Sequence, residues 1–239
     1  RTYMDAHPET AAAQPKIHAE WAHDSFEHAG AAGGFIDRFG YPFCRGRLLN
    51  VLEKDHGQYD TVRSLFWATG AALMVRPADW NAAGGFDARF FAHFEEIDFC
   101  WRLRARARKI VCITDSVVYH VGGGTLPADN PRKTYLNFRN SLTMLYKNLP
   151  DDELQHVLSV RKWLDAMAWF KFFVSGDFAN AKAVRRARKD FHKWQHQFDP
   201  ERKKNLENTT LFDIPERIQR SLIYAFYVQG KKTFAQFMS

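Results

Sequence analysis

The sequence predicts an α/β fold followed by a helical, basic region. Apolar runs of strand length lie at residues 9–18, 64–77 and 110–121, and helical segments separate the second run from the third. From residue 130 onward the spacing is helical, at residues 131–149, 151–174, 178–197 and 214–237. We therefore expect two domains, an α/β part over residues 1–130 and a helical extension over residues 131–239.

Composition excludes a disordered chain and leaves the class of partner open. Of the 239 residues, 46% are hydrophobic and 15% are aromatic, which is enough to bury a core. The formal net charge of +7 favours an acidic partner, namely nucleic acid, anionic lipid or a phosphorylated small molecule. Cys44, Cys100 and Cys112 are too widely spaced for a disulfide framework or a cysteine zinc site, so we expect a reducing compartment. No run is apolar enough for a membrane span, and no signal peptide is visible.

Glycine and proline set the expected ends of the elements in the first part. Residues 28–46 are rich in Gly and aromatic side chains and fit neither period, so we predict a loop. The apolar run at 64–77 is bounded by polar residues and proline, as expected of a buried strand. Residues 78–84 fit a short helix that a Gly-Gly pair ends, and the next helix is expected to end near Lys109.

Three carboxylates, Glu95, Glu96 and Asp98, occupy four positions at the start of that second helix. A structural role is the simplest interpretation, because acidic side chains in a first turn complement the helix dipole and Asp98 has ion-pair spacing to Arg102. A catalytic role is the alternative. The preceding run of phenylalanines would partly desolvate a nearby carboxylate, and crowded acids raise one another's pKa towards that of a useful base.

Three stretches occur in a specific order: TGAALMV, then GGFDARFFAHFEEIDFCWRLR, then IVCITDSVVYHVGGGT. From about Ala11 to Leu149 this order resembles the inverting family 2 glycosyltransferases of the GT-A fold, including rhamnosyltransferase-like members. The resemblance implies a partial GT-A (nucleotide-diphospho-sugar transferase) fold with a C-terminal helical extension. It also implies transfer of a sugar from a nucleotide-diphosphate donor to a glycan or lipid-linked acceptor, with inversion, in cell-surface polysaccharide synthesis.

The resemblance assigns roles to four of these residues. Glu96 occupies the position of the catalytic base, which deprotonates the acceptor hydroxyl. Glu95 and Asp98 match flanking acids that would orient acceptor hydroxyls, with Asp98 also holding Arg102. His120, at the end of the last strand, would join a divalent metal, Mn or Mg, that binds the donor diphosphate; a structural histidine is the alternative.

Four further residues are candidate substrate contacts. Trp67 could stack on a sugar, Gly70 could let backbone approach it, and Asp87 could contact the acceptor. Arg139 could grip the diphosphate, since a guanidinium binds two phosphate oxygens at once. Each has a structural alternative, which is core packing for Trp67 and Gly70, a turn for Asp87 and a helix surface for Arg139. The glycines after His120 are a candidate lid or phosphate contact.

The family's Asp-x-Asp motif and nucleotide-binding half have no counterpart before residue 60. We therefore expect the N-terminal donor-binding half to be missing, which leaves open the activity of this chain alone. The tail resembles membrane-associated extensions of bacterial members, and its aromatic and basic residues 168–194 favour peripheral contact with the inner face of the cell membrane from the cytoplasm. No nucleic-acid partner is expected, because no reader motif is present. The alternative function is an inactive fragment or homologue that acts as a membrane- or partner-binding module.

Overall fold

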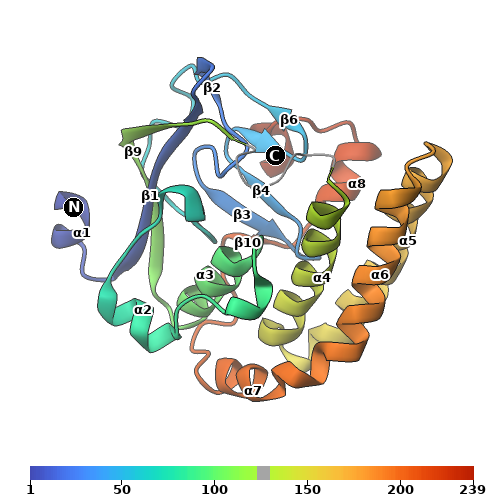
Figure 1. Cartoon of the computed structure of the whole chain (residues 1–239). Coiled ribbons are helices and arrows are strands. Elements are labelled where there is room, and N and C mark those ends of the chain that lie inside the picture. The colour runs from blue at the N-terminus through green and yellow to red at the C-terminus, as the bar shows by residue number, and fades with distance from the viewer. Residues whose placement is uncertain (123–129) are drawn as a thin grey trace. The chain divides into compact units, whose positions relative to one another are not determined.

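The computed structural model describes residues 1–122 and 130–239, which form two compact units. Unit 1 comprises residues 1–85, 99–122 and 210–239, and unit 2 comprises residues 86–98 and, within the described chain, 130–209. Unit 1 contains the strands and unit 2 is helical (Figure 1). The predicted α/β class is therefore confirmed.

The first sheet of unit 1 is built around two long parallel strands, β1 (Thr10–Ala19) and β9 (Lys109–His120). They lie side by side in Figure 1, with β2 (Ala22–Phe26) on the far side of β1, and they confirm two predicted strands. The strand predicted at 64–77 is wrong, because a 3-10 turn divides it into the short strands β7 (Arg63–Ser64) and β8 (Met74–Val75). The Thr69 hydroxyl accepts from the backbone of this turn, η1 (Gly70–Ala72), and so ends the extended run.

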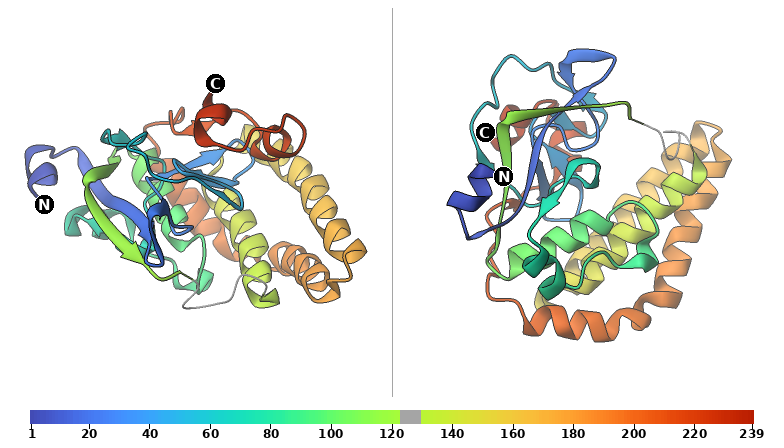
Figure 2. Two further views of the ribbon diagram at one scale, coloured as in Figure 1. Left: turned by 90° about the horizontal axis from the view of Figure 1, so that it is seen from above. Right: turned by 60° about the vertical axis from the view of Figure 1, so that its left-hand side comes forward.

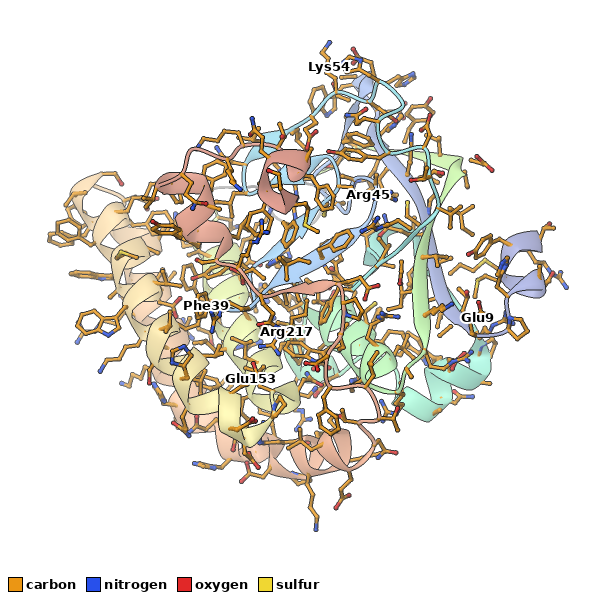
Figure 3. All side chains as sticks on the ribbon, turned by 180° about the vertical axis from the view of Figure 1, so that it is seen from behind. Glu9, Phe39, Arg45, Lys54, Glu153 and Arg217 are labelled. Atoms are coloured by element: carbon orange, nitrogen blue, oxygen red, sulfur yellow. The ribbon has the colours of Figure 1, made fainter. Side chains whose placement is uncertain are left out.

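The second sheet of unit 1 lies where a loop was predicted. Its strands are, in order, β10 (Arg217–Ile218), β3 (Gly34–Asp37), β4 (Pro42–Cys44), β5 (Arg47–Leu48) and β6 (Val51–Leu52). Glycines with φ of 106°, 82° and 92° at positions 33, 40 and 46 provide the turns. Each strand is then too short to show alternation, which is why the prediction for residues 28–46 was wrong. Arg45, labelled in Figure 3, is buried and donates to two backbone carbonyls beside this sheet.

Capping residues set the ends of several helices in unit 1. α2 (Pro77–Ala83) ends at Gly84 in the left-handed region, as predicted. α1 (Thr2–Ala6) precedes β1, and the helix predicted at 214–237 is wrong. That segment contains α8 (Leu222–Tyr227) and α9 (Phe234–Met238), because Ser221 and Thr233 each accept from the backbone and begin a new helix.

One helix contains the predicted carboxylates. α3 (Glu95–Ala105) confirms the predicted helix but ends four residues before Lys109. Its first turn belongs to unit 2 and the rest to unit 1. Within unit 1, Arg102 donates to the carbonyls of Ala83 and Gly85.

Unit 2 is a group of helices. α4 (Pro131–Asn148) and α5 (Asp151–Val174) match the predictions, α6 (Phe178–Trp194) is followed by the turn η3 (Gln195–Phe198), and α7 (Asp199–Glu207) was not predicted. Figures 1 and 2 show α4, α5 and α6 side by side, and Figure 3 marks Glu153 in the first turn of α5. A buried ion pair joins α5 to α6, in which Asp165 accepts from Arg161 at 3.3 Å and from Arg188 at 2.5 Å.

Two general expectations can be compared with these elements. The three cysteines are buried and carry free thiols. Across residues 1–122 and 130–239, no helix combines the length and the apolar character that crossing a membrane requires.

Candidate functional site

The backbone is strained immediately before the carboxylates of α3. Phe91, His93 and Phe94 have φ values of 67°, 69° and 73°, in the left-handed region that bulky side chains avoid. Each such residue costs on the order of 1–3 kcal/mol and persists only where the surrounding structure holds it. This strained loop, residues 91–94, aims the first turn of α3, in which the amide of Asp98 donates to the carbonyl of Phe94 at 2.8 Å.

Two neighbouring residues of α4 hold the strained loop in place. The Nδ2 atom of Asn140 lies 3.0, 2.9 and 2.7 Å from the carbonyl oxygens of Phe90, Ala92 and His93. Arg139 donates from Nη2 to the Phe90 carbonyl at 3.0 Å and to the Asn140 side-chain oxygen. These bonds offset the strain of the loop. Arg139 is buried and bonded to protein groups, and its contact with a donor diphosphate stays a prediction.

A buried lysine connects two of the predicted acids. Lys147 is 2% exposed, and its Nζ lies 2.9 Å from carboxylate oxygens of both Asp87 and Asp98. Asn148 donates to the other oxygen of Asp98 at 2.8 Å. Burial acts to raise the pKa of Asp87, but hydrogen bonds from Arg89 and the charge of Lys147 outweigh it and hold that pKa well below its ordinary range. Through Lys147, the two aspartates connect the segments on either side of the loop to α4.

Asp87 and Asp98 thus have structural partners at the positions where substrate contacts were predicted. Asp87 accepts from the backbone of Arg89 and begins the turn η2 (Ala88–Phe90), which is the turn role that the sequence left open. Asp98 is fully buried, and both of its oxygens are bonded to α4. Their contacts with an acceptor stay predictions.

Three of the ten buried side-chain nitrogen and oxygen atoms that have no partner among the described residues lie in one turn. Glu95 Oε2, Glu96 Oε2 and His93 Nε2 are buried and have no hydrogen-bond partner among the described residues. A buried polar atom without a partner costs free energy, and a catalytic role or a bound water or ion is among the reasons why such an atom is retained. This turn, residues 93–96, is our candidate site.

The pKa values of both acids of this turn are raised. Burial raises the pKa of Glu96 to about 7, and the charge of the adjacent Glu95 adds to the effect. Burial also raises the pKa of Glu95. Burial lowers the pKa of His93, with the Lys133 charge contributing, so this imidazole is neutral at pH 7. The raised pKa that the sequence predicted for an acid in this stretch is confirmed for Glu96.

His120, in unit 1, is paired with a carboxylate. Its Nδ1 lies 3.1 Å from Glu27 Oε2, and Glu27 is 6% exposed. Such a pair fixes a histidine ring and suits Nε2 to a metal. However, no group of three His, Cys, Asp or Glu side chains within residues 1–122 and 130–239 could hold a metal ion. The described ligands therefore fit the predicted metal only in part, and the glycines at 123–124 lie outside the described residues.

The two remaining predicted contacts also lie in unit 1. Trp67 is 4% exposed, donates from its indole nitrogen to the Phe35 carbonyl at 2.8 Å, and packs against Gly34, where a Cβ would meet the ring at 2.1 Å. These contacts are those of the packing alternative. Gly70 is exposed at the start of η1. Stacking by Trp67 and backbone approach at Gly70 stay predictions.

Three residues of the site were not predicted. His93 stands three positions before Glu96, and this spacing could have indicated it. Asn140 bonds to His93, 47 positions earlier, and Lys147 bonds to Asp87, 60 positions earlier. Contacts between residues so far apart in the chain cannot be seen in a single sequence.

The chain is similar to one known protein over part of its length. No family model matches the chain. Over 103 residues, 43% of the chain, it is 26% identical to a protein named "O-antigen biosynthesis protein RfbC" from Myxococcus xanthus. This match covers 8% of the length of that protein.

Proposed function

We propose that this chain belongs to the catalytic domain of an inverting glycosyltransferase of the GT-A fold, with Glu96 as the base. The observation that carries the proposal is the half-buried Glu96 carboxylate, whose Oε2 has no hydrogen-bond partner among the described residues and whose pKa is raised to about 7, in the turn that follows the strained loop. A carboxylate of this kind takes up a proton near neutral pH far more readily than an ordinary one. The order of the three sequence stretches supports the same conclusion.

In the proposed reaction, Glu96 takes the proton of the acceptor hydroxyl. The hydroxyl oxygen then forms a bond to the anomeric carbon of the sugar. The bond from that carbon to the diphosphate oxygen breaks, and its electron pair leaves with the nucleoside diphosphate. Glu95 orients the acceptor hydroxyl, and Asp87 and Asp98 hold the turn through Lys147.

The proposed product is a cell-surface polysaccharide or its lipid-linked precursor. The similarity to an O-antigen biosynthesis protein supports this substrate class. A divalent metal, Mn or Mg, would neutralise the donor diphosphate, with His120 as one ligand. No step above depends on it.

The stereochemistry of transfer tests the proposal. A polypeptide that includes the donor-binding half is incubated with a panel of nucleoside-diphosphate sugars and a glycan acceptor, and NMR determines the anomeric configuration of the product. We expect the configuration opposite to that of the donor. Retained configuration contradicts the proposal, as does binding of vesicles or partners with no transfer from any donor.

A second function, contact with an anionic membrane surface, is supported by the outer face of α5. Five large apolar side chains on this helix are between 47% and 73% exposed: Trp163, Met167, Phe170, Phe173 and Val174. Lys162 and Lys171 beside them are exposed, while the acid of this segment, Asp165, is fully buried. An exposed apolar stripe flanked by lysines suits an anionic bilayer interface.

Vesicle binding tests this surface. Replacing Trp163 and Phe170 together by alanine is expected to weaken co-sedimentation with phosphatidylglycerol vesicles at least about tenfold, because each buried side chain contributes roughly 1.5–3 kcal/mol. Gln155→Ala, an exposed polar position of α5 outside the stripe, is the matched control. Equal binding of wild type and the double variant, or equal binding to phosphatidylcholine, contradicts the membrane role.

A further inference from the structure

Unit 2 contains a groove that the proposed chemistry does not use. It lies between α4 and α6, which run side by side in Figures 1 and 2, and has a volume of about 650 Å³. Four cationic and three aromatic side chains are among those that line it: Arg132, Arg139, Lys182, Arg186, Phe91, Tyr135 and Trp194. No carboxylate is among its described lining residues.

Two of the exposed cations of the groove contact aromatic rings. The Arg132 guanidinium lies 4.6 Å from the ring centre of Phe91, and that of Arg186 lies 5.0 Å from the ring centre of Tyr135. The nearest acid is Asp190, which accepts from the Tyr135 hydroxyl at 2.8 Å and lies 3.5 Å from Arg186. Most of the positive charge in the groove is therefore not neutralised by carboxylates.

The buried cations of unit 2 differ from these exposed ones in their partners. The buried Lys147 and Arg161 are both paired with carboxylates, as burial of a charge requires. In the groove, Arg132, Lys182 and Arg186 are exposed. Arg132 and Arg186 contact aromatic rings, which do not cancel their charge. Among the described residues Asp190 pairs with Arg186, and no carboxylate pairs with Arg132 or Lys182. An arrangement of this kind binds an anion, and guanidinium groups favour phosphate oxygens.

We infer that this groove binds a diphosphate ester, with the anion on Arg132, Lys182 and Arg186 and the organic part against Phe91, Tyr135 and Trp194. Several cations in one groove favour a diphosphate over a singly charged ligand, and the aromatic walls favour an ester over the bare anion. Two sources share this chemistry, a nucleoside diphosphate and a lipid diphosphate carrier. Phe91 is also the first residue of the strained loop, so a ligand here would contact the segment that aims Glu96.

The inference concerns binding and is tested without catalysis. Isothermal titration calorimetry compares inorganic phosphate, inorganic pyrophosphate, uridine diphosphate and farnesyl diphosphate as ligands of the full chain. We expect pyrophosphate to bind more tightly than phosphate, and one of the two esters to bind more tightly still, which identifies the source. Affinity should fall with added salt, because the charged contacts are partly exposed.

Variants locate the ligand in the groove. Arg132→Ala combined with Lys182→Ala is expected to weaken ester binding at least about tenfold, because two charge-assisted contacts are lost. Arg185→Ala removes an equal charge from an exposed position of α6 that does not line the groove, and should leave affinity unchanged. The inference is overturned if the double variant binds the ester as wild type does, or if neither ester binds more tightly than inorganic phosphate. Failure of glycosyl transfer would not affect these results.

Discussion

Glu96→Gln is expected to reduce the rate of sugar transfer by about 10²- to 10⁴-fold, the usual contribution of a general base. The amide keeps the size of the side chain but cannot take a proton from the acceptor. Single-turnover kinetics at pH 8, with donor and acceptor both saturating, measure the effect on the chemical step. Donor affinity should stay close to that of wild type.

The glutamine variant also has a control for folding. Folding raises the pKa of Glu96 from the ordinary 4.5 to about 7, so the charged form is disfavoured in the native state. The stability linked to this group is fully present below pH 4.5 and is lost as the pH rises through 7. The variant avoids that loss, and in urea unfolding at pH 8 it should be at least as stable as wild type. Normal turnover by a folded variant would exclude Glu96 as the base.

Lys147→Met is expected to destabilise the protein by about 3–5 kcal/mol, because it removes the buried cation that Asp87 and Asp98 share. The side chain of Asp98 has no contact with solvent, so water cannot replace its lost contact with Lys147. Asp87 loses the charge that helps to keep its pKa low. Urea unfolding at pH 7 measures the change in the free energy of unfolding.

A second substitution separates the charge effect from the loss of side-chain packing. Adding Asp98→Asn to Lys147→Met removes the buried carboxylate charge that Lys147 faces, so the double variant should recover part of the lost stability. The conservative Lys147→Arg variant keeps the charge and should lose less than Lys147→Met. Equal stability of wild type and Lys147→Met would show that the buried pair does not hold the loop.

The sequence predicted the long elements well and the short ones poorly. α4 and α5 have helical spacing over many turns, and β1 and β9 are long apolar runs, so each was found within about a residue of its ends. The strands of the second sheet are two to four residues long and join through glycine turns, so they carry no periodic signal. At residues 64–77 a strand was predicted where the structure has a 3-10 turn between two short strands. An apolar run in the sequence does not distinguish a continuous strand from such an interrupted segment.

The sequence predicted a raised pKa in the carboxylate stretch, and the structure agrees on that point. Acids beside a run of phenylalanines predicted a raised pKa, and Glu96 has one. The contacts that hold the turn in place could not be predicted from the sequence. Asn140 bonds three carbonyls of a loop nearly fifty positions earlier, and left-handed Phe and His residues have no signature in a single sequence.

The central claim is that Glu96 changes protonation near neutral pH and that this change controls transfer. The most direct measurement is a carboxyl ¹³C NMR titration of Glu96, compared with the pH dependence of the transfer rate. We predict a common midpoint near pH 7, with the rate rising as the carboxylate forms. A Glu96 midpoint near the ordinary value of 4.5, or a rate that does not follow this titration, would contradict the account.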